Sequence, residues 1–252
     1  MIIQSSSSLK DLCVRIEENG YFGVDTEFIP ERSYYPRLGI IQVATGNYCA
    51  VIDPKCTKDL EPFCALLSNA SILTAVHAGA QDLQILARLS GTVPANIFDC
   101  QVAAALLGYG MSISYAKLVD SLLGIRLNKQ ETLTDWTVER LTPAQIEYAL
   151  EDVRHLPTLA ERLKEKLLRL DRMDWFREEV KGLEEETTYQ EIDSREYFWK
   201  VKGLSGLSRR RLAVLRELAA WRENTSRTRD VPRGQMVRDP ILIALAIRCP
   251  EK

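Results

Sequence analysis

The sequence predicts an α/β fold followed by a smaller, all-helical segment, and three observations support this prediction. Short apolar runs alternate with amphipathic runs of helical period over about the first 100 residues, and helical runs continue to about residue 170. Beyond about residue 203 only the helical period remains. The length of 252 residues suits one sizeable domain and a smaller one. We therefore expect an α/β domain over 1–170, a helical linker over 171–203 and a helical module over 204–252.

Five short segments read as strands because apolar and β-branched residues fill them and turn-forming residues bound them. The second and third strands are joined by Thr45-Gly46-Asn47, a typical hairpin turn. The expected strands are 21–28, 38–44, 48–52, 72–77 and 96–99.

The expected helices of the α/β domain are 9–18, 58–67, 81–89, 100–107, 114–123 and 143–170. Ser8 is the expected N-cap of the first of these helices. Thr142 is the expected N-cap of the last, with Pro143 at its first position. Pro157 lies inside this last helix and should kink or break it, because proline has no backbone N–H. Further helices are expected from Met173, from Ser208 through Trp221, and over 241–247.

Composition excludes several classes of protein. No run of about 18 apolar residues is present, so no membrane-spanning segment is expected. The first residues, 1–8, contain neither a basic start nor an apolar signal core, and we expect a cytoplasmic protein. The six cysteines form no C-x-x-C pair and only two histidines are present, so neither disulfides nor a zinc site is expected.

The first expected strand carries two acids in an otherwise apolar run. Asp25 and Glu27 are two residues apart, so both side chains point to the same face of the strand. Two such carboxylates repel each other unless a cation neutralises them, and Mg²⁺ or Mn²⁺ prefers oxygen ligands. The alternative is an edge strand whose acids face water.

Other acids could join this pair. Asp82 begins the helix after the fourth strand, although an acid there is also favoured by the helix dipole alone. Tyr148 and Asp152 are four residues apart and share one helix face, which also fits a simple surface hydrogen bond. Together, four carboxylates could hold two divalent ions about 3.5–4 Å apart and support phosphodiester hydrolysis, with Tyr148 holding the attacking water.

Basic residues gather in the last part of the chain. The segment 204–252 has 11 basic and 5 acidic residues, so it carries a charge of +6 while the remainder carries −8. This asymmetry indicates an appendage that touches a polyanion, although solvated helix faces would explain it equally well.

Three motifs in this order resemble those of the ribonuclease D family, in the tyrosine-containing subclass of the DEDD 3′–5′ exonucleases. They are Asp25-Thr26-Glu27-Phe28, the run from His77 to Leu83, and the run from Gln145 to Val153. Their order, spacing and flanking residues all agree with the family over most of residues 1–170. The segment from Leu215 to Pro240 resembles the first part of an HRDC module.

The resemblance implies a ribonuclease H-like exonuclease fold, with a mixed sheet of about five strands flanked by helices. It implies a metal-dependent 3′–5′ exoribonuclease acting on RNA 3′ ends, with tRNA precursors as the expected substrates. The alternatives are a 3′–5′ DNA exonuclease of the same superfamily and a non-catalytic RNA-binding adaptor. A monomer is expected.

The resemblance also assigns roles to individual residues. Asp25 would bridge two Mg²⁺ or Mn²⁺ ions, and Glu27 and Asp152 would complete the water-activating site. Asp82 would serve the leaving-group metal and Tyr148 would position the attacking water. The expected substrate-binding residues are Phe28, Tyr35, His77 and Gln81, of which Phe28 and Tyr35 could stack on terminal bases.

Overall fold

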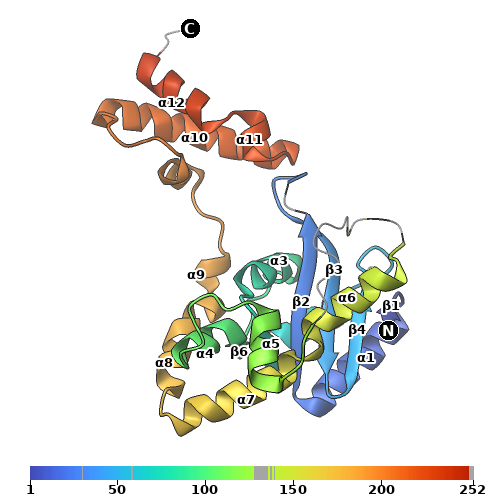
Figure 1. Ribbon diagram of the computed structural model, residues 1–252. Coiled ribbons are helices and arrows are strands. Elements are labelled where there is room, and N and C mark those ends of the chain that lie inside the picture. The colour runs from blue at the N-terminus through green and yellow to red at the C-terminus, as the bar shows by residue number, and fades with distance from the viewer. Residues whose placement is uncertain (30, 58, 128–135, 137, 139, 250–252) are drawn as a thin grey trace. The chain divides into compact units, whose positions relative to one another are not determined.

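The computed structural model describes residues 1–29, 31–57, 59–127, 136, 138 and 140–249. The chain divides into two compact units (Figure 1). The larger unit contains Met1–Phe28 and Leu38–Tyr189, and the smaller unit contains Ile29–Arg37 and Gln190–Lys252. Among the described residues, no helix combines the length and the hydropathy needed to cross a bilayer.

A six-stranded mixed sheet forms the centre of the larger unit, in the order β1-β4-β3-β2-β5-β6. The strands are β1 Ile2–Ile3, β2 Tyr21–Ile29, β3 Arg37–Thr45, β4 Tyr48–Ile52, β5 Leu73–Val76 and β6 Ile97–Asp99. The hairpin partners β3 and β4 are antiparallel, whereas β2 and β5, β5 and β6, and β1 and β4 are parallel. The expected α/β fold with a mixed sheet is therefore confirmed.

The helices of the larger unit follow the amphipathic runs of the sequence. They are α1 Ser6–Asn19, α2 Glu61–Leu67, α3 Ala80–Ser90, α4 Cys100–Leu106, α5 Tyr115–Leu123, α6 Pro143–Arg154, α7 Leu156–Arg169, α8 Met173–Val180, η1 Lys181–Glu184 and α9 Glu186–Tyr189. Helices cover both faces of the sheet. Because alternate residues of a strand point to opposite faces, each strand contributes side chains to both layers of packing. One core joins the sheet to α1, α2 and α3, and the others join it to α4, α6 and α7. Figure 1 shows α1 and α6 on opposite sides of the sheet.

Three details differ from the sequence-based expectations or refine them. Ser5, not Ser8, is the N-cap of α1, because its hydroxyl accepts the backbone N–H of Ser8. The two-residue β1 is a sixth strand that was not expected, since two residues are too few to show a periodic pattern. The long helix breaks at His155 into α6 and α7, as Pro157 predicted, and the backbone N–H of His155 donates to the hydroxyl of Tyr115 at 3.1 Å.

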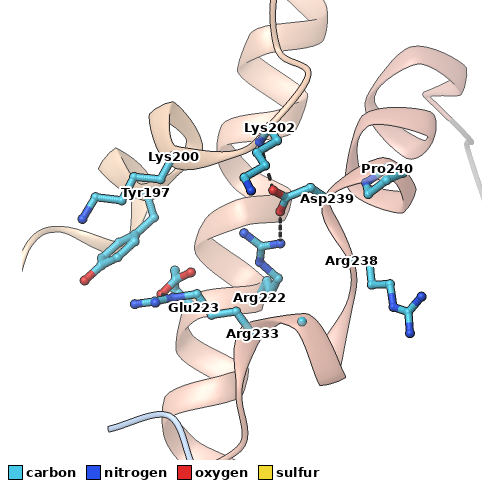
Figure 2. A pocket seen from close by; sticks show the side chains of 10 residues that line it. Tyr197, Lys200, Lys202, Arg222, Glu223, Arg233, Arg238, Asp239 and Pro240 are labelled. Atoms are coloured by element: carbon cyan, nitrogen blue, oxygen red, sulfur yellow. Dashed lines mark hydrogen bonds and ion pairs between the residues drawn. The ribbon is translucent and has the colours of Figure 1, made fainter. Parts of the chain in front are cut away.

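Helices make up most of the smaller unit. They are η2 Ser194–Lys200, α10 Arg209–Arg229, α11 Arg233–Met236 and α12 Asp239–Arg248. Helix α10 begins next to Ser208, where a helix start was expected, and Ser208 is its N-cap because its hydroxyl accepts the backbone N–H of Arg211. Leu215 and Ala219 of α10 pack with Leu242 and Ala246 of α12, and Phe198 of η2 completes this apolar core. A pocket of about 520 Å³ lies among these helices and is lined by residues between 197 and 240 (Figure 2).

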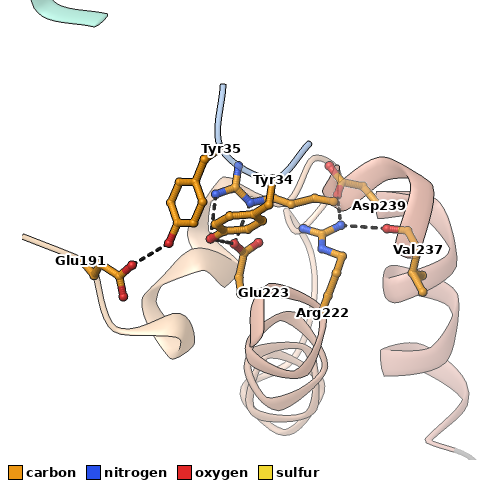
Figure 3. A network of polar contacts seen from close by, with 8 residues as sticks. Tyr34, Tyr35, Glu191, Arg222, Glu223, Val237 and Asp239 are labelled. Atoms are coloured by element: carbon orange, nitrogen blue, oxygen red, sulfur yellow. Dashed lines mark hydrogen bonds and ion pairs between the residues drawn. The ribbon is translucent and has the colours of Figure 1, made fainter. Parts of the chain in front are cut away.

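The smaller unit also contains the loop that joins β2 to β3. The hydroxyl of Tyr34 donates to Glu223 Oε2 at 2.9 Å, and Arg233 lies over the ring of Tyr34 at 4.8 Å from its centroid (Figure 3). The backbone N–H of Tyr34 donates to Asp230 Oδ1 at 3.1 Å. The hydroxyl of Tyr35 donates to Glu191 Oε1 at 2.6 Å. This loop is therefore bound by residues that follow it in sequence by more than 150 positions.

Candidate active site

Strand β2 places two of the predicted acids inside the sheet. Its hydrogen-bonded neighbours are β3 and β5, so the strand is not at an edge, and Asp25 and Glu27 are both half-buried. A Cβ added at Gly23 would lie 2.6 Å from the Cβ of Leu156, the first residue of α7. Glycine at this position therefore lets the junction of α6 and α7 pack directly on β2, which brings α6 to the acidic strand.

Asp82 lies in the first turn of α3 and is buried. Its Oδ1 accepts a hydrogen bond of 2.5 Å from the hydroxyl of Thr26, the residue between the two acids of β2. The turn before α3 is fixed by the buried Asp99, which accepts the backbone N–H groups of Ala78 and Gly79 at 3.1 Å each. Asp82 is thereby attached to the same strand that carries Asp25 and Glu27.

Helix α6 supplies the last two members of the predicted set. It begins with a capping box in which Thr142 and Gln145 exchange backbone and side-chain hydrogen bonds. Tyr148 and Asp152 share one face of the helix, and the hydroxyl of Tyr148 is hydrogen-bonded to Asp152. The ring of Tyr148 lies 6.0 Å from that of Trp136, measured between centroids.

The four carboxylates are close enough to change one another's ionisation. Burial raises the pKa of Asp25 well above its ordinary value, and the charges of Asp82, Asp152 and Glu27 raise it further. Burial raises the pKa of Glu27 to about 8, with further contributions from Asp152 and Asp82. Burial also raises the pKa of Asp82, although the hydroxyl of Thr26 opposes the shift. The structure thus brings together carboxylates from β2, α3 and α6.

This arrangement fits a divalent cation in its chemistry. The donor set consists of carboxylate oxygens, which Mg²⁺ and Mn²⁺ prefer, and the mutual repulsion of the acids is what a cation would relieve. Within the described parts of the chain, no three histidine, cysteine or acidic side chains form a ready-made coordination group.

The tyrosine of this set is held in its protonated form. Burial raises the pKa of Tyr148, and the charges of Asp152 and Glu27 raise it further. Its hydroxyl is therefore a hydrogen-bond donor throughout the neutral range. A neutral hydroxyl beside a group of carboxylates can orient a water or a phosphate oxygen, but it is a poor base.

The four expected substrate-binding residues lie in different surroundings. Phe28 is half-buried near the end of β2, and Gln81 is exposed in the first turn of α3. His77 is half-buried, with Nε2 3.0 Å from the carbonyl oxygen of Ile113 and its ring packed edge-on against Tyr115. Tyr35 belongs to the smaller unit, where it donates to Glu191, so it is not grouped with the other three.

Sequence reasoning overlooked two residues that hold the site in place. Thr26 lies between the two acids of β2 and was given no role, although its hydroxyl orients Asp82. Asp99 was assigned only to a strand end. Its position before the helix 100–107 is a typical N-cap signal, and it does accept the backbone N–H of Gln101 at 2.8 Å.

Comparison with protein-family models matches both parts of the chain. Residues 1–168 match the model of the 3′–5′ exonuclease domain, and residues 211–252 match the model of the HRDC domain. The first match covers the sheet and the acids of the candidate active site, Asp25, Glu27, Asp82 and Asp152.

Known proteins resemble the chain over most or all of its length. Ribonuclease D of Sphingobium indicum is 38% identical over 251 residues, which are 99% of this chain, and the chain spans 64% of the length of that protein. The crystal structure of Escherichia coli RNase D, an exoribonuclease involved in structured RNA processing, has a TM-score of 0.93 at 31% identity, covering 100% of this chain and 67% of the other. Brucella melitensis NrnC with bound Mg²⁺ shares the fold, with a TM-score of 0.60 at 24% identity, covering 78% of this chain and 92% of the other.

The family match therefore rests on three agreeing findings: the exonuclease and HRDC models, the curated relatives, and the fold of a solved ribonuclease D. The chain belongs to the ribonuclease D family, with a 3′–5′ exonuclease domain followed by an HRDC domain.

Proposed function

We propose that the chain is a 3′–5′ exoribonuclease that uses two divalent ions, Mg²⁺ or Mn²⁺, to hydrolyse the terminal phosphodiester of RNA. The main support is the group of four carboxylates from β2, α3 and α6, in which burial and the charges of Asp82 and Asp152 raise the pKa values of Asp25 and Glu27. Such a group is costly to bury unless it binds cations. The family relatives named ribonuclease D favour RNA as the substrate.

The roles of the residues follow from their places in the site. Asp25, Glu27, Asp82 and Asp152 would hold the divalent ions. When bound, the ions would activate a water molecule and stabilise charge at the phosphate. Tyr148 would orient the attacking water through a hydrogen bond with its hydroxyl, which stays protonated beside Asp152.

Two further residues would support these ligands without contacting the RNA. Thr26 would hold the carboxylate of Asp82 through its hydroxyl hydrogen bond. Asp99 would fix the turn from which α3 begins. Such outer contacts orient ligands and commonly change metal affinity by about 10–100-fold when they are removed.

The substrate would be a single-stranded RNA 3′ end, and we propose tRNA precursors as the physiological class. Phe28, His77 and Gln81 are the candidates for contacts with the terminal nucleotides in the larger unit, and Tyr35 in the smaller one. We also propose the domain boundaries 1–170, 171–203 and 204–252, which agree in position with the family matches at 1–168 and 211–252.

The decisive experiment compares the intact chain with its Asp25→Asn variant on a 5′-labelled oligoribonucleotide in Mg²⁺ and in Mn²⁺. We expect the intact chain to shorten the RNA one nucleotide at a time from its 3′ end, and the variant to lose nearly all turnover. Unchanged turnover in the variant would refute the assignment of the carboxylates.

Two parallel arms address the other candidate functions. A matched DNA oligomer that is degraded faster than the RNA would identify a DNA exonuclease. RNA binding without any hydrolysis in either metal would identify a non-catalytic adaptor. A tRNA precursor with a 3′ extension, compared with an unstructured RNA of equal length, tests the proposed substrate class.

A further inference from the structure

The pocket of the smaller unit is strongly cationic. Its lining consists of Tyr197, Lys200, Lys202, Arg222, Glu223, Arg233, Gly234, Arg238, Asp239 and Pro240. Five of these side chains are basic and two are acidic, so the lining carries a net charge of +3. Its volume of about 520 Å³ lies within the range of roughly 300–1,000 Å³ that small-ligand sites occupy.

The two acids of the pocket are already neutralised by two of its arginines. Asp239 Oδ1 accepts from Arg222 at 2.7 Å, and Glu223 Oε2 accepts from Arg233 at 2.6 Å (Figure 2). Lys200, Lys202 and Arg238 have no ion pair with any acid of the described chain. The excess positive charge therefore comes from three exposed side chains around a neutralised floor.

One buried donor in that floor points to an anionic ligand. Arg222 is only 5% exposed, and it donates to Asp239 and to the carbonyl oxygen of Val237, yet its Nε is buried without a hydrogen-bond partner. Glu223 Oε1 is likewise without a partner, but this carboxylate is already paired with Arg233. A buried guanidinium with an unused donor is unfavourable unless an acceptor reaches it.

A backbone hydrogen bond places Lys202 beside the start of α12. The backbone N–H of Lys202 donates to Asp239 Oδ2 at 2.9 Å, which attaches the segment after η2 to the start of α12. Tyr197 does not offer a free ring for a base, since Lys200 and Arg233 each lie 4.8 Å from its centroid. The pocket is thus built to recognise charge, not an aromatic base.

We infer that this pocket is a phosphate-binding site, formed by Lys202 and Arg238 at its rim and Arg222 in its floor. Phosphate fits because it carries up to two negative charges and accepts several charge-assisted hydrogen bonds at once, which Arg and Lys donors favour. Tyr197, Lys200 and Lys202 precede residue 211, so the site is not confined to the segment that matches the HRDC model. It uses none of the carboxylates of the proposed active site.

The test measures phosphate binding to the full chain in EDTA, where no metal-dependent hydrolysis can occur. Isothermal titration calorimetry with inorganic phosphate should show saturable binding to one site. The double variant Lys202→Gln/Arg238→Gln removes two charged donors and should weaken it by about tenfold or more, since losing even one charge-assisted hydrogen bond accounts for that factor. Neither side chain belongs to an ion pair of the described chain, so both changes should leave the fold intact.

Two control variants make the result specific. Arg210→Gln removes one exposed positive charge from the start of α10, outside the pocket, and should change phosphate affinity less than twofold. Asp25→Asn should leave phosphate affinity unchanged, which separates this site from the proposed nuclease site. Absence of saturable binding, or an equal loss in Arg210→Gln, would overturn the proposal, as would loss of binding in Asp25→Asn.

A competition arm identifies the source of the phosphate. A short oligoribonucleotide that displaces inorganic phosphate from the intact chain, but binds the double variant at least tenfold more weakly, would show that the site takes a phosphate of RNA. Saturable phosphate binding that the oligoribonucleotide does not displace would show that the site takes a free phosphate or a mononucleotide, which titration with 5′-AMP would then identify.

Discussion

The hydroxyl of Tyr34 donates a hydrogen bond of 2.9 Å to Glu223, a carboxylate that is 0% exposed and lies 189 residues further along the chain. The same oxygen accepts from Arg233 Nε at 2.6 Å. A buried carboxylate needs such partners, because an unpaired charge in the interior is strongly unfavourable. The contact holds the loop 29–37 inside the smaller unit.

Glu223→Ala should destabilise the smaller unit by about 1–3 kcal/mol, because it leaves Tyr34 and the half-buried Arg233 without their shared acceptor. Hydrogen exchange of the α10 backbone amides measures this change. Glu217→Ala is the matched control, since it removes an exposed carboxylate paired with Arg195 on the same helix, and it should have little effect. Equal protection in both variants would contradict a structural role for Glu223.

Gly23→Ala should lower the free energy of unfolding of the larger unit by about 1–3 kcal/mol. The new Cβ would lie 2.6 Å from the Cβ of Leu156, so β2 and α7 must move apart. Gly182→Ala adds the same methyl group where nothing lies within 4 Å, and it should not be destabilising. Urea denaturation of the two variants checks this, and the prediction fails if their midpoints are equal.

Metal-free protein should unfold at a lower temperature at pH 8 than at pH 6. The pKa of Glu27 is raised to about 8, so the folded state keeps a proton that the unfolded state releases near pH 4.5. Stability is therefore lost as pH rises between these two values. Thermal melts in EDTA should show this slope flattened in Glu27→Gln and unchanged in the exposed control Glu178→Gln. Added Mg²⁺ should raise the melting temperature most at pH 8.

Tyr148→Phe should reduce the turnover number about 100-fold while leaving the Mg²⁺ concentration for half-maximal activity nearly unchanged. The variant keeps the ring beside Trp136 but loses the hydroxyl that is hydrogen-bonded to Asp152. Single-turnover kinetics with increasing Mg²⁺ separate the two quantities. A large shift in the Mg²⁺ requirement would mean that Tyr148 acts on the ligands and not on the water.

Thr26→Val should raise the Mg²⁺ concentration for half-maximal activity about 10-fold, because Asp82 loses the hydroxyl that orients it. Thr26→Ser keeps the hydroxyl and should restore the normal requirement. If valine and serine behave alike, the hydroxyl hydrogen bond does not support the site.

Sequence reasoning predicted the elements whose signals are local. The acids of β2 stood out because Asp25 and Glu27 interrupt an apolar run, and the α6–α7 break followed from Pro157. Capping by Ser5 in place of Ser8 shows the limit of such signals, because four serines in a row offer several equivalent caps.

Contacts between distant parts of the sequence were not predictable in this way. No sequence signal near Thr26 indicates that its hydroxyl forms a hydrogen bond with Asp82, 56 residues away. Tyr35 was assigned to the substrate as a candidate for stacking on a terminal base, and its hydroxyl donates to Glu191, 156 residues later. A short loop can pack in one unit while the strands on either side of it belong to the other. Such a placement is visible only in the three-dimensional structure.

The two units are interleaved along the chain, because Ile29–Arg37 belongs with Gln190–Lys252. Proteolysis at any one peptide bond therefore cannot yield both of them whole. Cleavage after Tyr189, for example, would leave Tyr34 and Tyr35 on the larger fragment. Their hydroxyl groups would then lack the hydrogen-bond acceptors Glu223 and Glu191. The exposed aromatic loop would be prone to aggregation, and joint expression of the two fragments should suppress this by reassembly.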